Sequence, residues 1–212
     1  MEIIIIYDNT AYEPSLTPAW GFSCLIRHAG ATLLFDTGAN GEILLSNMQK
    51  IDIDPESVDT VVLSHPHFDH VGGLENFLAF NSRAKVYLPD TGATDMYSRG
   101  IPLSAPQKLA PGIYTTGVLS SIEQSLLVEI SNGVALISGC AHPGLKHILQ
   151  AASKFGKVKA IIGGLHDFKD FSLLKDIEMI CPTHCTFYLS RLQEMFPEQY
   201  IQGGAGRRIY LE

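Results

Sequence analysis

The chain has 212 residues, of which 46% are apolar and 17% are charged, and its net charge is −7 at neutral pH. This composition is typical of a globular protein and excludes a disordered one, and the length favours a single domain over residues 1–212. The negative charge argues against a broad nucleic-acid or membrane surface, so we expect a small-molecule substrate. The oligomeric state stays open.

The apolar run at residues 1–7 predicts a first buried strand. It is too short to span a membrane, and it lacks the basic start and cleavage site of a signal peptide. The four cysteines, without an export signal, predict reduced thiols and a cytoplasmic location.

The remaining elements alternate along the chain in two halves. Strands are predicted at residues 22–28, 32–35, 58–63, 85–88, 113–116, 125–130, 134–137, 158–162 and 209–211. Helical patterns occupy residues 41–50, 74–80, 145–155, 171–177 and 188–196. Residues 90–111 hold several Gly, Pro and Ser residues and predict a long loop or lid. Hairpins followed by alternating strands and helices indicate two sheets packed face to face, with helices outside.

A cluster of ligand-type residues follows the apolar run at 61–63 with the spacing H-x-H-x-D-H. Its members are His65, His67, Asp69 and His70. In an extended segment side chains alternate, so the first three would point to one side. Four such groups at a strand end predict a metal site that suits two metals better than one. The alternative is a solvated histidine-rich loop.

Three further histidines also follow strands and glycine-type turns, namely His142, His166 and His184. Strand ends can meet at one rim of a sandwich, so these positions suit convergence on the cluster. A lone histidine is more often a hydrogen-bonded surface or core residue. Beside a metal half-site we predict His142 and His184 as ligands, and His166 stays open between a ligand and an outer partner.

Two other residues have two interpretations each. The thiolate of Cys140 would bind zinc, but a cysteine also fits a crowded strand end as a small apolar residue, and packing is favoured. Asp36 follows an apolar strand and is expected to accept a hydrogen bond from the far nitrogen of a ligating histidine. Its alternative role is a helix cap near Asn40.

With these residues in hand, the chain resembles the metallo-β-lactamase superfamily. The Phe-Asp-Thr-Gly at 35–38, the cluster at 65–70 and the later histidines occur in the order that superfamily uses. The resemblance implies an α/β fold, a four-layer αβ/βα sandwich of two mixed sheets with a dinuclear metal site at one edge. The strings at 139–144, 163–166 and 182–186 resemble a branch of metal-dependent hydrolases that includes dihydropterin ribofuranosylaminobenzene phosphate synthases.

The sequence also departs from the superfamily pattern. Residues 122–126 contain no histidine where a third motif is expected. Either His142 supplies that ligand by another route, or Cys140 and His142 together replace two ligands. The bridging carboxylate has no clear counterpart, and Asp167 is the only nearby acid.

The expected chemistry follows from this ligand set. We assign His65, His67 and His142 to one metal, and Asp69, His70 and His184 to the other. Such ligands suit two zinc ions, and also iron or manganese. A metal-activated hydroxide would attack an ester, lactone or phosphate-type substrate, with Asp69 as the catalytic residue that orients it.

Two residues are weaker candidates for substrate binding. Trp20 lies in a loop and would cover a flat ring such as a pterin, or it simply packs the loop down. Lys146, at a predicted helix start, would bind phosphate, or it is solvated.

Four alternatives to a hydrolase of small molecules remain. They are a pterin-related synthase or transferase, a catalytically silent metal-binding sensor, a nuclease, and a redox di-iron centre. The last is disfavoured because such centres resemble H-x-E-x-D-H, with Glu where His67 stands.

Overall fold

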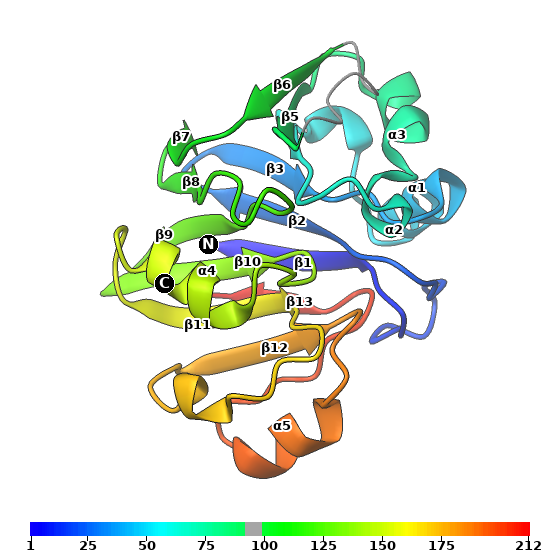
Figure 1. Cartoon of the computed structure of the whole chain (residues 1–212). Helices are drawn as coiled ribbons and strands as arrows, with labels where there is room; N and C mark the ends of the chain where they lie inside the picture. Colours follow the sequence, from blue (N-terminus) through cyan, green and yellow to red (C-terminus); the bar gives the residue numbers. More distant parts are fainter. Residues whose placement is uncertain (92–98) are drawn as a thin grey trace.

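A computed structural model of the chain, which describes residues 1–91 and 99–212, contains two mixed β-sheets (Figure 1). The first sheet has the order β13-β1-β2-β3-β4-β5-β6. Its strands are β1 (Glu2–Tyr7), β2 (Ser23–His28), β3 (Ala31–Phe35), β4 (Thr60–Val62), β5 (Lys85–Pro89), β6 (Gly100–Leu103) and β13 (Arg208–Tyr210). The second sheet has the order β12-β11-β10-β9-β8-β7. Its strands are β7 (Gln107–Ala110), β8 (Ile113–Thr115), β9 (Leu126–Ile130), β10 (Gly133–Ser138), β11 (Val158–Gly164) and β12 (Met179–Thr183).

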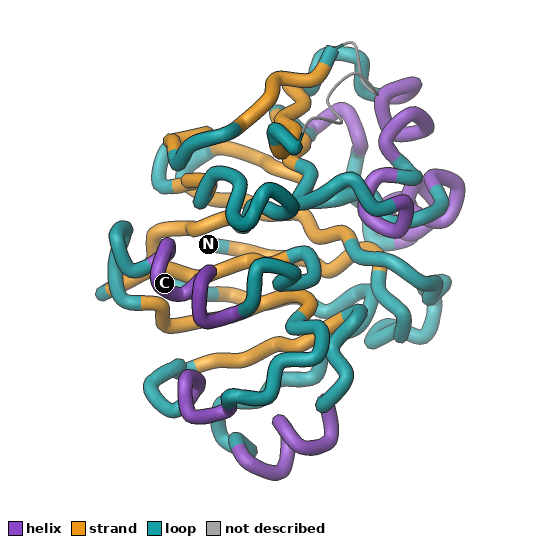
Figure 2. The backbone as a smooth tube through the Cα atoms, in the orientation of Figure 1, coloured by secondary structure: helices purple, strands orange, loops and turns teal. Residues whose placement is uncertain are grey.

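The helices lie outside the strands (Figure 2). They are α1 (Gly41–Lys50), α2 (Phe68–Val71), α3 (Leu74–Phe80), α4 (Leu145–Ala152) and α5 (Leu189–Met195), with 3₁₀ turns η1 (Pro55–Ser57) and η3 (Phe171–Leu174). No helix in the described part of the chain is long and apolar enough to cross a membrane.

Three apolar layers hold the sandwich together. In β1, Ile3 and Ile5 belong to the core between the sheets, whereas Ile4 and Ile6 pack toward α1 and α3. The strand is therefore buried on both faces, which explains its continuous apolar run. On the outer face of the second sheet, Ile148 of α4 packs in the third layer. The arrangement confirms the predicted four-layer αβ/βα sandwich with two mixed sheets.

Parallel strands carry the loops of interest. Strands β3, β4 and β5 run parallel in the first sheet, and β10, β11 and β12 run parallel in the second. In α/β sheets, ligand sites form outside the carboxyl ends of such strands. The loops after β4, β10, β11 and β12 carry all of the predicted histidine ligands.

Two local predictions were wrong. The expected long loop over 90–111 contains β6 and β7, although residues 92–98 lie outside the described part. Both are terminal strands of their sheets, where Gly, Pro and exposed side chains are tolerated, so their composition resembles that of a loop. The segment at 64–70 is extended only as far as His67, because α2 begins at Phe68. Asp69 and His70 therefore lie on a helical turn.

Candidate metal centre

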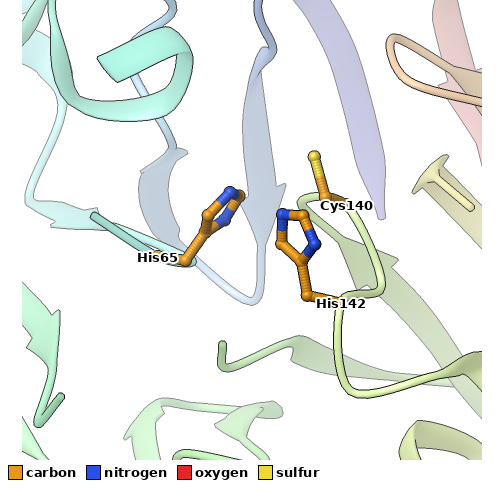
Figure 3. Close-up of side chains that lie close together, drawn as sticks. All are labelled: His65, Cys140 and His142. Atoms are coloured by element: carbon orange, nitrogen blue, oxygen red, sulfur yellow. The ribbon is translucent and has the colours of Figure 1, made fainter. Parts of the chain in front are cut away.

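Histidine and cysteine side chains from both sheets meet in two groups at one edge of the sandwich. Ligand atoms of His65, Cys140 and His142 lie within 4.8 Å of one another, and those of His70, Cys140 and His184 do the same. Figure 3 shows the first group, with His65 and His142 coming from separate loops and the Cys140 sulfur beside them. Cys140 belongs to both groups, so it stands between them.

The other two members of the 65–70 cluster lie beside these groups. The ring of His67 is 4.5 Å from that of His65 and 4.9 Å from that of His142, measured between centroids. Asp69 Oδ2 lies 3.2 Å from His184 Nε2. His67 is thus next to the first group and Asp69 is next to the second. This arrangement agrees with the assignment of His67 and Asp69 to the two metals from the sequence. Their binding of metal stays a prediction.

The imidazoles offer free lone pairs to the centre. His65 Nε2 and His142 Nε2 are buried and have no hydrogen-bond partner among the described residues. Burial, helped by the neighbouring histidines, lowers the pKa of His65 and lowers that of His142 to about 4. Both rings are therefore neutral at physiological pH, the form in which histidine binds metals. Buried polar atoms without partners are costly, and a metal ion that accepts their lone pairs would satisfy them.

Asp36 holds His70 in place. Its Oδ2 lies 2.7 Å from His70 Nδ1, and both side chains are fully buried. Ser64 donates to the same carboxylate twice, from its backbone N–H and from its hydroxyl, each at 2.7 Å. Burial lowers the pKa of His70, but the Asp36 carboxylate outweighs it and raises the net value. With Nδ1 engaged, Nε2 is left to face Cys140 Sγ at 3.2 Å.

Two more histidines have similar partners on their far nitrogens. Ser64 Oγ lies 2.8 Å from His65 Nδ1, and Asn9 Oδ1 lies 3.0 Å from His184 Nδ1. Such contacts fix the orientation of a ring and the nitrogen that it presents to a metal. Asn40, by contrast, caps α1 by itself, so Asp36 is not needed there.

Glu123 organises the loop after β10, and no pattern in the sequence indicates this role. This fully buried side chain accepts backbone N–H bonds from Cys140 and Ala141 at Oε1 and from His142 at Oε2, at 2.9–3.0 Å. Burial raises the pKa of Glu123. Residues 122–126 stood out only for lacking a histidine. Apart from a longer contact with the Ser138 hydroxyl at 3.4 Å, the partners of the Glu123 carboxylate are backbone groups, so no residue spacing could reveal it.

Several site residues have backbone torsions that L side chains rarely adopt. Asp36, Ala141, His166 and His184 have φ values of 58°, 61°, 48° and 47°. Each such residue costs on the order of 1–3 kcal/mol, and such strain gathers at functional sites.

The remaining predicted residues differ in how close they come. Trp20 Nε1 donates to Asp69 Oδ2 at 2.9 Å. The ring of His166 lies 5.0 Å from that of His142, and Asp167 Oδ1 lies 3.5 Å from His166 Nδ1. Lys146 is exposed in the first turn of α4.

Comparisons with known proteins agree with this fold. The sequence model described as the metallo-beta-lactamase superfamily matches residues 21–108. A relative from Methanocaldococcus jannaschii, 7,8-dihydropterin-6-methyl-4-(beta-D-ribofuranosyl)-aminobenzene-5'-phosphate synthase, is 26% identical over 91% of this chain and 89% of its own length. A ribonuclease Z from Aeropyrum pernix is 34% identical, over 35% of this chain and 23% of that protein.

Among solved structures, Tm1679 is described as a metal-dependent hydrolase of the beta-lactamase superfamily. It superposes with a TM-score of 0.80 at 22% identity, covering 100% of this chain and 99% of that one. At this identity the likeness establishes the fold.

Proposed function

We infer that this chain, which belongs to the metallo-β-lactamase superfamily, is a metal-dependent hydrolase with two divalent ions at the loops after β4, β10 and β12. The observation that carries the proposal is the pair of donor groups that share Cys140, together with the buried Nε2 atoms of His65 and His142, which have no hydrogen-bond partner in the described part of the chain. Imidazole, thiolate and carboxylate donors together suit zinc best.

The residues that would hold the first ion are His65, His67 and His142, and those for the second are Asp69, His70 and His184. Cys140 lies within reach of both positions, so we propose that it contributes its thiolate as well. When bound, such ions supply a nucleophile from water at neutral pH and stabilise the oxyanion of an ester, lactone or phosphate substrate.

The protein's own part is orientation and charge. Three imidazole rings are oriented through contacts at Nδ1, which come from Asp36, Ser64 and Asn9. The Asp69 side chain is 20% exposed and therefore stands at the mouth of the site. Burial raises the pKa of Asp69, but its contact with His184 and the nearby histidine charges outweigh this and leave the pKa below its usual range. An ionised Asp69 can accept a hydrogen bond from the attacking water.

A second candidate function is a pterin-related synthase or transferase. It is favoured by the Methanocaldococcus jannaschii relative, whose printed name is that of a synthase and which aligns with nearly the whole chain. The same site would then bind a phosphorylated substrate without hydrolysing it.

The test begins with the metal content and activity of the purified protein. We expect about two equivalents of zinc, and metal-dependent turnover of at least one member of a panel of phosphodiesters, carboxylic esters, lactones and RNA. A chelator should abolish the turnover and added zinc should restore it. A parallel assay for the product named in the synthase relative separates the two functions.

Variants complete the test. His142→Ala and His184→Ala should lose metal and activity. His147→Ala is the matched control, because His147 is exposed on α4 and contacts Ser120 instead. Unchanged metal content in both site variants would refute the proposed centre.

A further inference from the structure

We propose that Trp20 is a positioning residue whose indole N–H holds Asp69 in the orientation that binds the second metal ion. The proposal rests on the metal centre inferred above. From the sequence, Trp20 was expected either to cover a flat substrate ring or to pack the loop down.

One oxygen atom connects the two residues to the centre. Trp20 Nε1 donates to Asp69 Oδ2 at 2.9 Å, and the same Oδ2 lies 3.2 Å from His184 Nε2 and 3.9 Å from His70 Nε2. The oxygen that faces both histidines of the second group is therefore the one that the indole holds. A carboxylate oxygen has two lone pairs, so it can accept this bond and bind a cation together.

Packing does not account for the position of this side chain. Trp20 is 60% exposed, and its ring meets the ring of His184 in an edge arrangement, with centroids 4.9 Å apart. A large apolar side chain gains little from so exposed a place. The hydrogen bond to an ionised carboxylate is of the stronger, charge-assisted kind.

The backbone beside Trp20 grips the same aspartate. Phe22 N–H donates to the Asp69 carbonyl at 3.2 Å, while Gly21 N–H donates to Asn9 Oδ1 at 3.1 Å. Gly21 has φ +138°, and a Cβ there would meet the Asp69 carbonyl oxygen at 2.5 Å. Glycine is thus required for this close approach. These backbone contacts therefore hold the loop so that Trp20 lies beside Asp69.

The need for such a restraint follows from where Asp69 lies. It stands in the single turn of α2, with its side chain partly exposed, and could otherwise rotate toward water. Partners that orient a metal ligand are typically worth about 10- to 100-fold in metal affinity. We expect that effect at the second ion alone. Trp20 contacts Asp69 and His184, which are both proposed for the second ion, whereas His65 and His142 are proposed for the first.

Trp20 is the only tryptophan in the chain, which allows a test at a single atom. Biosynthetic replacement of tryptophan by β-(3-benzothienyl)alanine exchanges the N–H for sulfur and keeps the ring. The matched control is 4-fluorotryptophan, which keeps the N–H. Zinc is titrated against a chromophoric chelator, which reports the two binding steps separately.

We expect the benzothienyl protein to bind its second zinc about 10- to 100-fold more weakly, with the first step unchanged, and the fluoro control to match the unmodified protein. Trp20→Phe should reproduce the benzothienyl result and serves in its place if the analogue does not fold. Two zinc affinities equal to those of the unmodified protein in the benzothienyl or Trp20→Phe protein would overturn the role of Trp20 and leave the metal centre standing. An unmodified protein that binds no zinc would overturn both.

Discussion

At the scale of single residues, Asp36 links the sheet to the candidate metal centre. Its carboxylate accepts both Ser64 donors and meets His70 Nδ1, all within 2.7 Å and in a fully buried place. Ser64 in turn contacts His65, so one aspartate orients a histidine of each donor group.

We therefore predict that Asp36→Asn lowers zinc affinity by about 10- to 100-fold, because the amide is a weaker acceptor than the carboxylate. The measurement is a competition titration of zinc against a chelator. Asp54→Asn is the matched control, since Asp54 caps the distant η1 turn with a similar carboxylate contact. Equal affinities in the two variants would contradict the role of Asp36.

Site residues that belong to a recognisable motif could be predicted from the sequence. Residues that support the site through hydrogen bonds to the backbone could not. The spacing at 65–70 was visible, and so was the strand-end place of His142 and His184. Glu123 was not, because three of the four hydrogen bonds to its carboxylate come from backbone N–H groups that any sequence would present. Asn9 was also hidden, since it lies 175 residues away from His184 along the chain.

At the scale of elements, the loop between β8 and β9 joins the two halves of the site. Glu123 accepts from the loop after β10. Its neighbour Gln124 donates from Nε2 to the Leu63 carbonyl at 2.8 Å and from its backbone N–H to the Ser64 carbonyl at 2.9 Å. The loop thus connects the segment after β4, which contains His65, to the loop after β10, which contains His142.

Glu123→Gln should lower the free energy of unfolding by about 2–3 kcal/mol. The substitution replaces a charged acceptor by a neutral one, and it places the amide N–H₂ group of glutamine against backbone N–H groups that also donate. Urea denaturation monitors this, with Glu194→Gln on the exposed face of α5 as the control. Zinc affinity should fall along with stability. A variant as stable as the control would show that the Cys140–His142 loop holds its shape unaided.

Elements with a strong period were predicted well, whereas the two edge strands β6 and β7 were not. The helix expected at 74–80 is α3 with the same bounds, and the apolar runs at 1–7 and 158–162 are β1 and β11. Strands β6 and β7 escaped because an edge strand has few buried side chains to impose a pattern. The turn of α2 escaped because four residues are too few for any helical period.

At the scale of the whole molecule, the core between the sheets carries the stability. Phe35 is fully buried there, one residue before Asp36. Phe35→Ala should cost about 3–5 kcal/mol of unfolding free energy, through lost burial and the cavity left behind. Phe80→Ala, at a side chain that is 63% exposed, should stay within about 0.5 kcal/mol of the parent. Urea midpoints for the two variants provide the comparison, and similar losses would contradict the layered core.

The metal centre itself should act as a clamp between the sheets. Its proposed ligands come from the loop after β4 in the first sheet and from the loops after β10 and β12 in the second. Binding to the folded state alone stabilises it by RT ln(1 + [M]/Kd), about 2.7 kcal/mol at a hundredfold excess over Kd. We therefore expect the chelated protein to melt at a lower temperature than the zinc-loaded one, with a Tm that rises with free zinc. His184→Ala removes the contribution of β12 and should flatten that dependence, whereas His147→Ala should leave it as in the parent. If zinc binds but the Tm does not depend on its concentration, the ions do not bind preferentially to the folded state, and the clamp is refuted.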